Sequence, residues 1–227
     1  MNDVIAELKL TYIEEITKTV TPYIIFTSVF YLVCIVVWTH DRGLWNNLTS
    51  YNIFVLFDLS NGPIKEAFVK DILASLIGAI LTKHSYQVSK KLYFNFVTNR
   101  IDLESRINEK IKESKQLKSE NDAINLFIAS ELQKDKQNKI KNMDSNHSVG
   151  KVAITVFWAS SLSCCFVLFV SAAQGKLLFC KADFFVSLAS AIIVLYVQER
   201  NVIHFLKAIM PLIIVEKTLL GKTYELN

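Results

Sequence analysis

Residues 152–174, VAITVFWASSLSCCFVLFVSAAQ, contain no charged side chain and lie between Lys151 and Lys176. A helix needs about 20 apolar residues to cross the hydrocarbon core of a bilayer, so this stretch predicts a membrane span. The stretch TVTPYIIFTSVFYLVCIVVWT predicts a second span, over about residues 20–39. The composition agrees, because a chain of 227 residues that is 52% hydrophobic and 20% charged is more apolar than most soluble domains of this length.

Two shorter apolar runs predict two further spans. Residues 184–198, FFVSLASAIIVLYVQ, are uncharged between Asp183 and Glu199. The alternative for this run is a helix buried in a soluble domain. Residues 64–82, IKEAFVKDILASLIGAILT, carry four charges in their first half, which we place at the outer interface while the later turns cross. The alternative for residues 64–82 is a helix that does not cross fully.

The uneven distribution of basic residues predicts the orientation, because Lys and Arg favour cytoplasmic loops. Residues 83–151 contain fourteen Lys or Arg against nine Asp or Glu, whereas residues 40–63 contain one Arg against two Asp. We therefore expect an all-α integral membrane protein of a bacterial inner membrane, with four spans and both termini in the cytoplasm. The expected segments are residues 1–82 with the first two spans, the cytoplasmic helical region 83–151, residues 152–198 with the last two spans, and a cytoplasmic or interfacial helix in residues 199–227.

The cytoplasmic region, residues 83–151, is the part of the protein that we predict to bind a partner. Residues 101–141 contain no Gly or Pro, and their apolar residues recur near the helical period, which predicts two helices. The turn between them is expected in residues 120–123 or in residues 141–148. The interleaved acidic residues dilute the positive field, so we expect a soluble protein partner and no direct nucleic-acid binding. The candidate partner-binding residues are Ile107, Ile111, Leu117, Ile124 and Ile128, and Phe127 belongs to the same apolar stripe.

Small residues recur on one face of the second predicted span. Ala74, Gly78 and Thr82 are spaced four residues apart, which lets helix backbones approach closely inside lipid. We expect them to be helix-packing residues, with partners on the third and fourth spans. The contact is either within one chain or between copies of a homo-oligomer.

The charged residues at the start of the same segment are candidates for receiving an external signal or for lining the outer mouth of a pore. They are Lys65, Glu66, Lys70 and Asp71, and ionisable groups near lipid are functional candidates by default. The alternative is a helix start at the interface in which Glu66 and Lys70 form an i, i+4 pair. Near the end of the first span, Trp38 and Trp45 predict an interfacial aromatic belt, with a binding site as the alternative.

No motif in the chain points to catalysis. The four cysteines include no CxxC pair, and the four histidines have no spacing typical of zinc ligands. No Gly-rich phosphate loop, Ser/His/Asp set or intramembrane carboxylate pair is present. We therefore expect no enzyme activity, no catalytic residues, no cofactor and no metal site.

The layout resembles the membrane subunit of the bacterial Kiwa anti-phage system: two spans, a long charged helical insertion in residues 83–151, two more spans and a short tail. It is also similar to other small multi-pass membrane effectors of bacterial defence loci. The first resemblance covers the whole chain in length and topology and includes no motif, so no functional residue is carried over. It implies a homo-oligomeric membrane sensor or scaffold that recruits a soluble partner at its cytoplasmic helices. A self-oligomerising pore that depolarises the membrane is the alternative, favoured by the hydroxyl and thiol side chains of residues 160–165.

Overall fold

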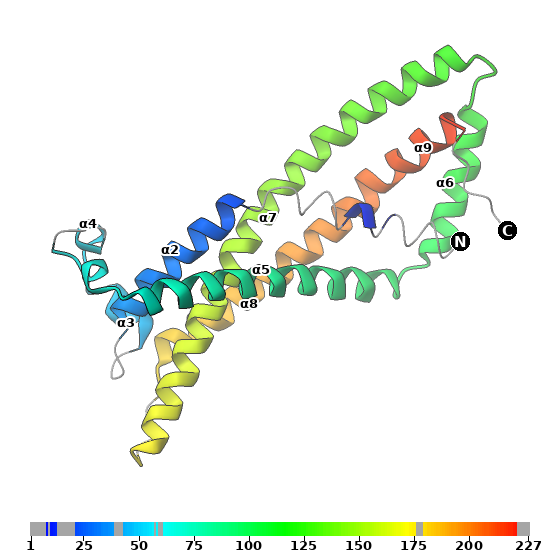
Figure 1. Ribbon diagram of the computed structural model, residues 1–227. Coiled ribbons are helices and arrows are strands. Elements are labelled where there is room, and N and C mark those ends of the chain that lie inside the picture. The colour runs from blue at the N-terminus through cyan, green and yellow to red at the C-terminus, as the bar shows by residue number, and fades with distance from the viewer. Residues whose placement is uncertain are drawn as a thin grey trace. The chain divides into compact units, whose positions relative to one another are not determined.

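The computed structural model describes residues 8, 10–12, 21–38, 43–56, 58, 61–175 and 179–221. Over these residues the secondary structure is helical and includes no strand, which confirms the all-α fold class (Figure 1). The elements in chain order are α2 (Thr21–Val37), α3 (Leu44–Leu48), α4 (Ile53–Leu56), the 3-10 turn η1 (Pro63–Glu66), α5 (Val69–Thr98), α6 (Leu103–Leu117), α7 (Asp122–Ala173), α8 (Lys181–His204), the π-helical turn η2 (Phe205–Ile209) and α9 (Met210–Leu219).

The second predicted helix starts later and ends later than expected. The sequence predicts it over residues 64–82, but residues 63–66 form η1 and Ala67 is extended, with φ −67° and ψ 127°. The carboxylate of Asp71 accepts a hydrogen bond of 2.9 Å from the backbone N–H of Phe68, which supports a helix start at this point. From there α5 continues for 30 residues without a break.

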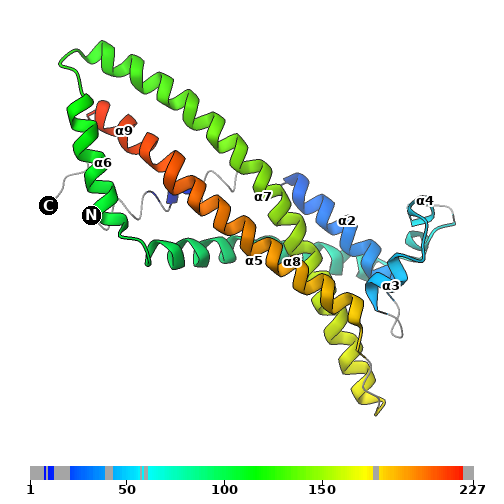
Figure 2. The ribbon, with the colours of Figure 1, turned by 180° about the vertical axis from the view of Figure 1, so that it is seen from behind.

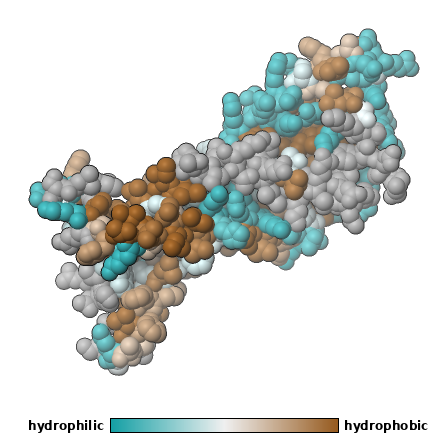
Figure 3. Space-filling view, viewed as in Figure 1, coloured by the Kyte–Doolittle hydropathy of each residue, from teal (hydrophilic) through white to brown (hydrophobic). Residues whose placement is uncertain are grey.

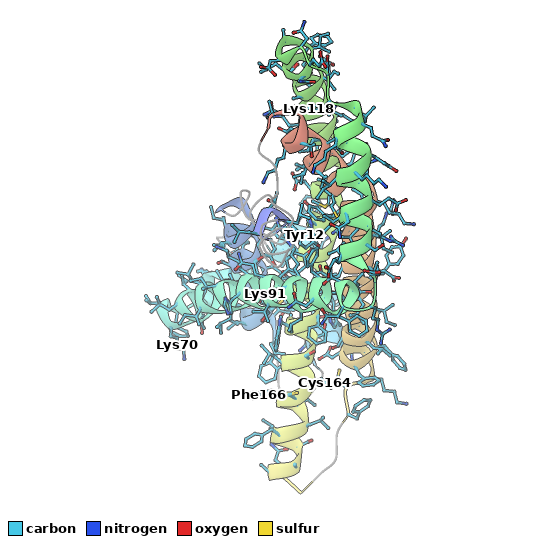
Figure 4. All side chains as sticks on the ribbon, turned by 90° about the vertical axis from the view of Figure 1, so that its right-hand side faces the viewer. Tyr12, Lys70, Lys91, Lys118, Cys164 and Phe166 are labelled. Atoms are coloured by element: carbon cyan, nitrogen blue, oxygen red, sulfur yellow. The ribbon has the colours of Figure 1, made fainter. Side chains whose placement is uncertain are left out.

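The connection between α6 and α7 falls near the first of the two predicted turns. The Asn125 side chain accepts a hydrogen bond of 2.9 Å from the Ser119 backbone N–H and donates one of 2.8 Å to the Ser119 carbonyl. Asn121 accepts a hydrogen bond of 3.0 Å from the Ala123 N–H in the first turn of α7. Lys118 lies in this connection (Figure 4). The other predicted turn, in residues 141–148, is wrong, because α7 is helical for 52 residues.

The chain divides into two compact units, each built from segments far apart in the sequence. Unit 1 comprises Met1–Lys18, Val88–Ser148 and Val197–Asn227. Unit 2 comprises Thr19–Gln87 and Val149–Tyr196.

Unit 1 has a conventional hydrophobic core. Helix α6 lies beside α9, as both ribbon views show (Figures 1 and 2). Ile107 and Ile111, one turn apart on α6, pack in the same cluster as Ile213 of α9. The ion pair between Lys136 and Glu216, 2.7 Å apart, joins α7 to α9. The C-terminal helix therefore buries its apolar face in protein.

Tyr12 adds an aromatic group to this core from the N-terminal segment (Figure 4). Its ring stacks on Phe94 of α5 at 4.9 Å and meets the edge of Phe205 at 5.0 Å. Aromatic pairs in these geometries add to the stabilisation from burial alone.

The π-helical turn η2 interrupts the last long helix of unit 1 just before Pro211. Pro211 has no N–H to donate to the carbonyl of Lys207, and its ring would clash with that carbonyl in a regular α-helix. Widening the turn to π geometry over residues 205–209 relieves this conflict.

Unit 2 buries only small hydrophobic clusters, such as that of Val33 and Val37, and exposes many large apolar side chains. Its helices bury small and hydroxyl residues, among them Ser75, Thr82 and Ser160, each at most 2% exposed. They expose large apolar residues, including Ile77, which is 57% exposed, and Ile192, which is 59% exposed. Hydrophobic residues gather over the first half of α5 in the space-filling view (Figure 3). Soluble domains have the reverse arrangement.

Among the residues that the structure describes, α7 is the one helix both long enough and apolar enough to cross a membrane. The apolar part of α2, Tyr23–Val37, is shorter. The structure thus supports the membrane class weakly by this measure, and the number of spans stays a prediction.

Candidate functional site

A buried carboxylate in unit 2 organises the segment between α2 and α5. Asp183, in the first turn of α8, is 0% exposed. Its carboxylate accepts hydrogen bonds from the backbone N–H groups of Leu44 at 2.9 Å and Trp45 at 3.0 Å, which are the first residues of α3. The Ser163 hydroxyl of α7 donates to the same carboxylate at 2.5 Å. A buried carboxylate with three donors is well satisfied, so it fixes α3 against α7 and α8.

Gly43 makes this arrangement possible. Its φ of 75° lies in the region that favours glycine, and a Cβ there would lie 2.7 Å from Asp183 Oδ2 and against Cys180 Sγ. Burial raises the pKa of the Cys180 thiol, and the neighbouring carboxylate raises it further. The buried Cys180 side chain packs beside Gly43 and Asp183.

The two tryptophans of the expected belt bind serines of α7. Trp38 Nε1 donates to Ser163 Oγ at 2.9 Å, and Trp45 Nε1 donates to Ser160 Oγ at 2.7 Å. Together with Asp183 they form a polar network that we call the Asp183 cluster, made of Trp38, Trp45, Ser160, Ser163 and Asp183. In the sequence, Asp183 marks only the boundary of a predicted span. No local pattern could reveal its backbone partners Leu44 and Trp45, which are 139 and 138 residues away.

The small-residue ridge packs against α2. A Cβ built on Gly78 would lie 3.2 Å from the Tyr31 ring, and the Tyr31 hydroxyl is 2.5 Å from Thr82 Oγ1. Since the Thr82 hydroxyl donates to the Gly78 carbonyl at 2.8 Å, Tyr31 is the donor to Thr82. Gly78 and Thr82 therefore contact α2, whereas their expected partners were on α7 and α8. Ala74 is exposed.

The four candidate receiver charges do not form one cluster on a helix. Lys65 and Glu66 lie in η1, before α5 begins, so the predicted i, i+4 pair of Glu66 and Lys70 within one helix is wrong. The Lys70 ammonium lies 5.1 Å from the Phe68 ring centroid, and Asp71 accepts from the Phe68 N–H. Two of the four charges thus support the start of α5.

The candidate partner-binding residues separate into two groups. Ile107 is 0% exposed and Ile111 is 3% exposed, because both pack against α9 in the core of unit 1. The expectation that these two residues bind a partner is therefore corrected. Leu117, Ile124 and Ile128 are exposed.

Ile124 and Ile128 share one face of α7 with Phe127, which is 67% exposed. We call Ile124, Phe127 and Ile128 the α7 stripe. The buried residues of this part of α7, Asn125 and Ala129, lie on another face.

These sites offer apolar contact and structural hydrogen bonds. Among the described residues, no group of three or more His, Cys, Asp or Glu side chains is placed to hold a metal ion. No protein-family model, curated protein or solved structure matches this chain.

Proposed function

We propose that the protein is a multi-pass inner-membrane sensor or scaffold that recruits a soluble protein through its cytoplasmic helices. Unit 2 supplies the four spans, in α2, α5, α7 and α8. Residues 83–151 lie in the cytoplasm with both termini, and copies of the chain associate. The role that we propose is in anti-phage defence, and the resemblance of the layout to defence-system membrane subunits supports it.

The observation that carries the proposal is the reversed side-chain distribution of unit 2. In lipid, apolar side chains gain nothing by turning inward, and helices associate through small residues and interhelical hydrogen bonds. Unit 2 has such bonds between α2 and α5, from Tyr31 to Thr82, and between α7 and α8, from Ser161 to Ser187 at 2.7 Å. In water the same surface would drive aggregation.

The α7 stripe supports the scaffold role. Its three apolar side chains are exposed together on one face of a helix, apart from the buried core of unit 1. An exposed apolar face on a helix, spaced at i, i+3 and i+4, is a common way to bind a protein partner.

The pore alternative rests on the hydroxyl and thiol run of residues 160–165, and the three hydroxyls of that run are engaged within the chain. Ser160 accepts from Trp45, Ser161 bonds to Ser187, and Ser163 donates to Asp183. Hydroxyls engaged between helices of one chain do not line a polar path. We therefore propose the scaffold and not the pore.

Cysteine labelling tests the topology. In a cysteine-free background, single cysteines replace Asn46, Gln116 or Gln174, which are all exposed. We expect a membrane-impermeant maleimide to label positions 46 and 174 in intact spheroplasts, and position 116 only after lysis. Labelling of position 116 in intact spheroplasts would contradict the cytoplasmic location of residues 83–151.

Affinity purification tests the partner. The tagged chain is purified from its host in mild detergent, as the wild type, Ile124→Glu or Leu126→Glu. Leu126 is 61% exposed and lies on the same turn outside the stripe, which makes it a matched control. We expect a stoichiometric soluble protein with the wild type and with Leu126→Glu, and its loss with Ile124→Glu. Equal recovery from all three, or no partner from any, contradicts recruitment through the stripe.

A further inference from the structure

The last third of α5, which belongs to unit 1, carries an exposed apolar stripe. Val88, Leu92 and Phe96 follow one another at intervals of four residues and are 41%, 63% and 50% exposed. Residues at this interval share one face of a helix, and we call these three the α5 stripe. The opposite face is buried in protein, since Lys90 and Phe94 are at most 5% exposed. A contiguous apolar face of this kind marks an interaction surface.

The charges beside the α5 stripe are positive. Lys91 is exposed next to Leu92 (Figure 4). The guanidinium carbon of Arg100, which is also exposed, lies 4.0 Å from the Phe96 ring centroid. From residue 72 to residue 101 the chain contains no Asp or Glu, and its four Lys or Arg residues are Lys83, Lys90, Lys91 and Arg100. The surface therefore fits an occupant that is apolar and carries negative charge at its edge.

Two acidic groups from other elements come near this end of α5. Glu199 of α8 interacts electrostatically with Tyr93, which lies on the flank of the α5 stripe away from Lys91. The carboxylate of Asp102 is engaged as the N-cap of α6, where it accepts a hydrogen bond of 3.1 Å from the Ser105 backbone N–H. The flank that carries Lys91 thus keeps its positive charge.

The length of α5 relates the α5 stripe to the bilayer. With 30 residues and a rise of about 1.5 Å per residue, α5 is about 45 Å long. A bilayer is about 30 Å thick in its hydrocarbon core and about 40–45 Å thick with its headgroup layers. In the proposed topology α5 begins at the outer surface, so its last third reaches the boundary between acyl chains and headgroups in the inner leaflet.

We propose that the α5 stripe binds anionic phospholipids of the inner leaflet. Its apolar side chains lie at the acyl boundary, and Lys91 and Arg100 contact the headgroup phosphates. Helices with an apolar face and cationic flanks bind anionic membrane surfaces in this way. The inference rests on the proposed membrane insertion of unit 2.

Fluorescence quenching on the full-length chain tests the lipid contact. Leu92→Cys or Leu126→Cys is introduced into a cysteine-free chain, labelled with bimane and reconstituted into vesicles of equal phosphatidylglycerol and phosphatidylcholine with doxyl-labelled acyl chains. Leu126 of α7 is 61% exposed, which matches Leu92. We expect the doxyl lipids to quench the label at position 92 several-fold more than the label at position 126. Equal quenching at the two positions overturns the inference.

Placing the doxyl group on one lipid at a time tests the headgroup. At position 92 we expect doxyl phosphatidylglycerol to quench about twofold more than doxyl phosphatidylcholine, because two cations attract the anionic lipid. Lys91→Gln with Arg100→Gln should remove this difference. Lys112→Gln with Lys115→Gln on α6, which removes two exposed charges from the same unit, should keep it. Equal quenching by the two lipids in the parent chain, or the same response in both double variants, overturns the assignment to anionic headgroups.

A third labelled position separates this inference from the proposed function. Ile192→Cys places bimane on α8 at a site that is 59% exposed in unit 2. If doxyl lipids leave position 192 unquenched, membrane insertion fails and the lipid contact fails with it. If they quench position 192 but not position 92, the lipid contact alone fails. Cross-linking of two chains through position 92 in such a sample would mean that a second copy covers the α5 stripe.

Discussion

Tyr12 packs its ring against Phe94 and Phe205, and its buried hydroxyl has no hydrogen-bond partner among the residues that the structure describes. A buried unsatisfied hydroxyl costs about 1–3 kcal/mol, so Tyr12→Phe should raise the free energy of unfolding by up to that amount. Tyr12→Ala should instead lower it by about 3–5 kcal/mol, because the ring is lost from the core. Chemical unfolding in detergent measures both changes. A destabilised Tyr12→Phe would mean that the hydroxyl has a partner such as a bound water.

The same variant has a second readout in alkaline solution. Burial raises the pKa of the Tyr12 phenol above its ordinary value of about 10. The neutral phenol is therefore favoured in the folded state, and this stability is fully present below about pH 10 and lost as the pH rises toward the folded pKa. Tyr12→Phe should lose less stability than the wild type above about pH 10. Parallel pH profiles contradict the burial of this side chain.

Asp183 tests whether the Asp183 cluster fixes α3. Asp183→Asn replaces one acceptor oxygen with an amide donor while two backbone N–H groups and a serine hydroxyl still point at it. Hydrogen bonds to a charged group contribute about 1.5–3 kcal/mol, so a loss of that size is expected in thermal unfolding. Asp135→Asn is the control, since Asp135 forms an exposed pair with Lys139 that contributes about 0–1 kcal/mol. Equal losses of stability in Asp183→Asn and Asp135→Asn would mean that the effect comes from the change in net charge and not from the hydrogen bonds of Asp183.

At the scale of elements, Gly78 sets the distance between α2 and α5. Gly78→Leu puts a side chain into the Tyr31 ring, whose hydroxyl is held by Thr82, so the ring has little room to move. Overpacking of this kind costs about 1–3 kcal/mol. Ala74→Leu, one turn earlier, adds bulk beside an open apolar cavity and should be tolerated. Thermal unfolding in detergent compares the two, and equal stability would contradict the close approach of the helices.

The two groups of isoleucines in the cytoplasmic region make another comparison between elements. Ile107→Ala removes a buried side chain of α6 and should lower the free energy of unfolding by about 2–5 kcal/mol. Ile124→Ala removes a 47% exposed side chain of α7 and should change it by about 0.5 kcal/mol or less. Denaturant unfolding of unit 1 in the full chain provides the measurement. An unchanged free energy of unfolding in Ile107→Ala would contradict the burial of Ile107.

At the scale of the whole molecule, the reversed side-chain distribution of unit 2 predicts how charge is tolerated. Ile192 in unit 2 and Leu126 in unit 1 are about equally exposed, at 59% and 61%. In a soluble protein, an aspartate at either position would be harmless. In a membrane protein, Ile192→Asp should cost about 2.5–3.5 kcal/mol of insertion, whereas Leu126→Asp should cost nothing. Carbonate extraction of membranes from cells that express each variant checks this, and equal extraction would argue against insertion of α8.

The sequence predicted the parts of this fold that depend on local pattern. Uncharged apolar runs located α2, the second half of α7 and α8. Residues 120–123 were one of two positions predicted for the turn before α7, and the polar residues of the other position, 141–148, are helical. Two features depend on contacts between distant residues and could not be predicted. Tyr12 reaches a core built mainly by residues beyond position 90, and Asp183 bonds to residues near position 44. A single sequence carries no signal that pairs such positions.

The wide turn before Pro211 has a consequence for related sequences. A π turn is an α-helix with one residue added, and here the proline imposes it. In homologues with another residue at position 211, a regular α-helix can form, and the additional residue of the π turn is not required. Such homologues are expected to carry a single-residue deletion between positions 205 and 209, with Ile213 and Ile214 still facing the core.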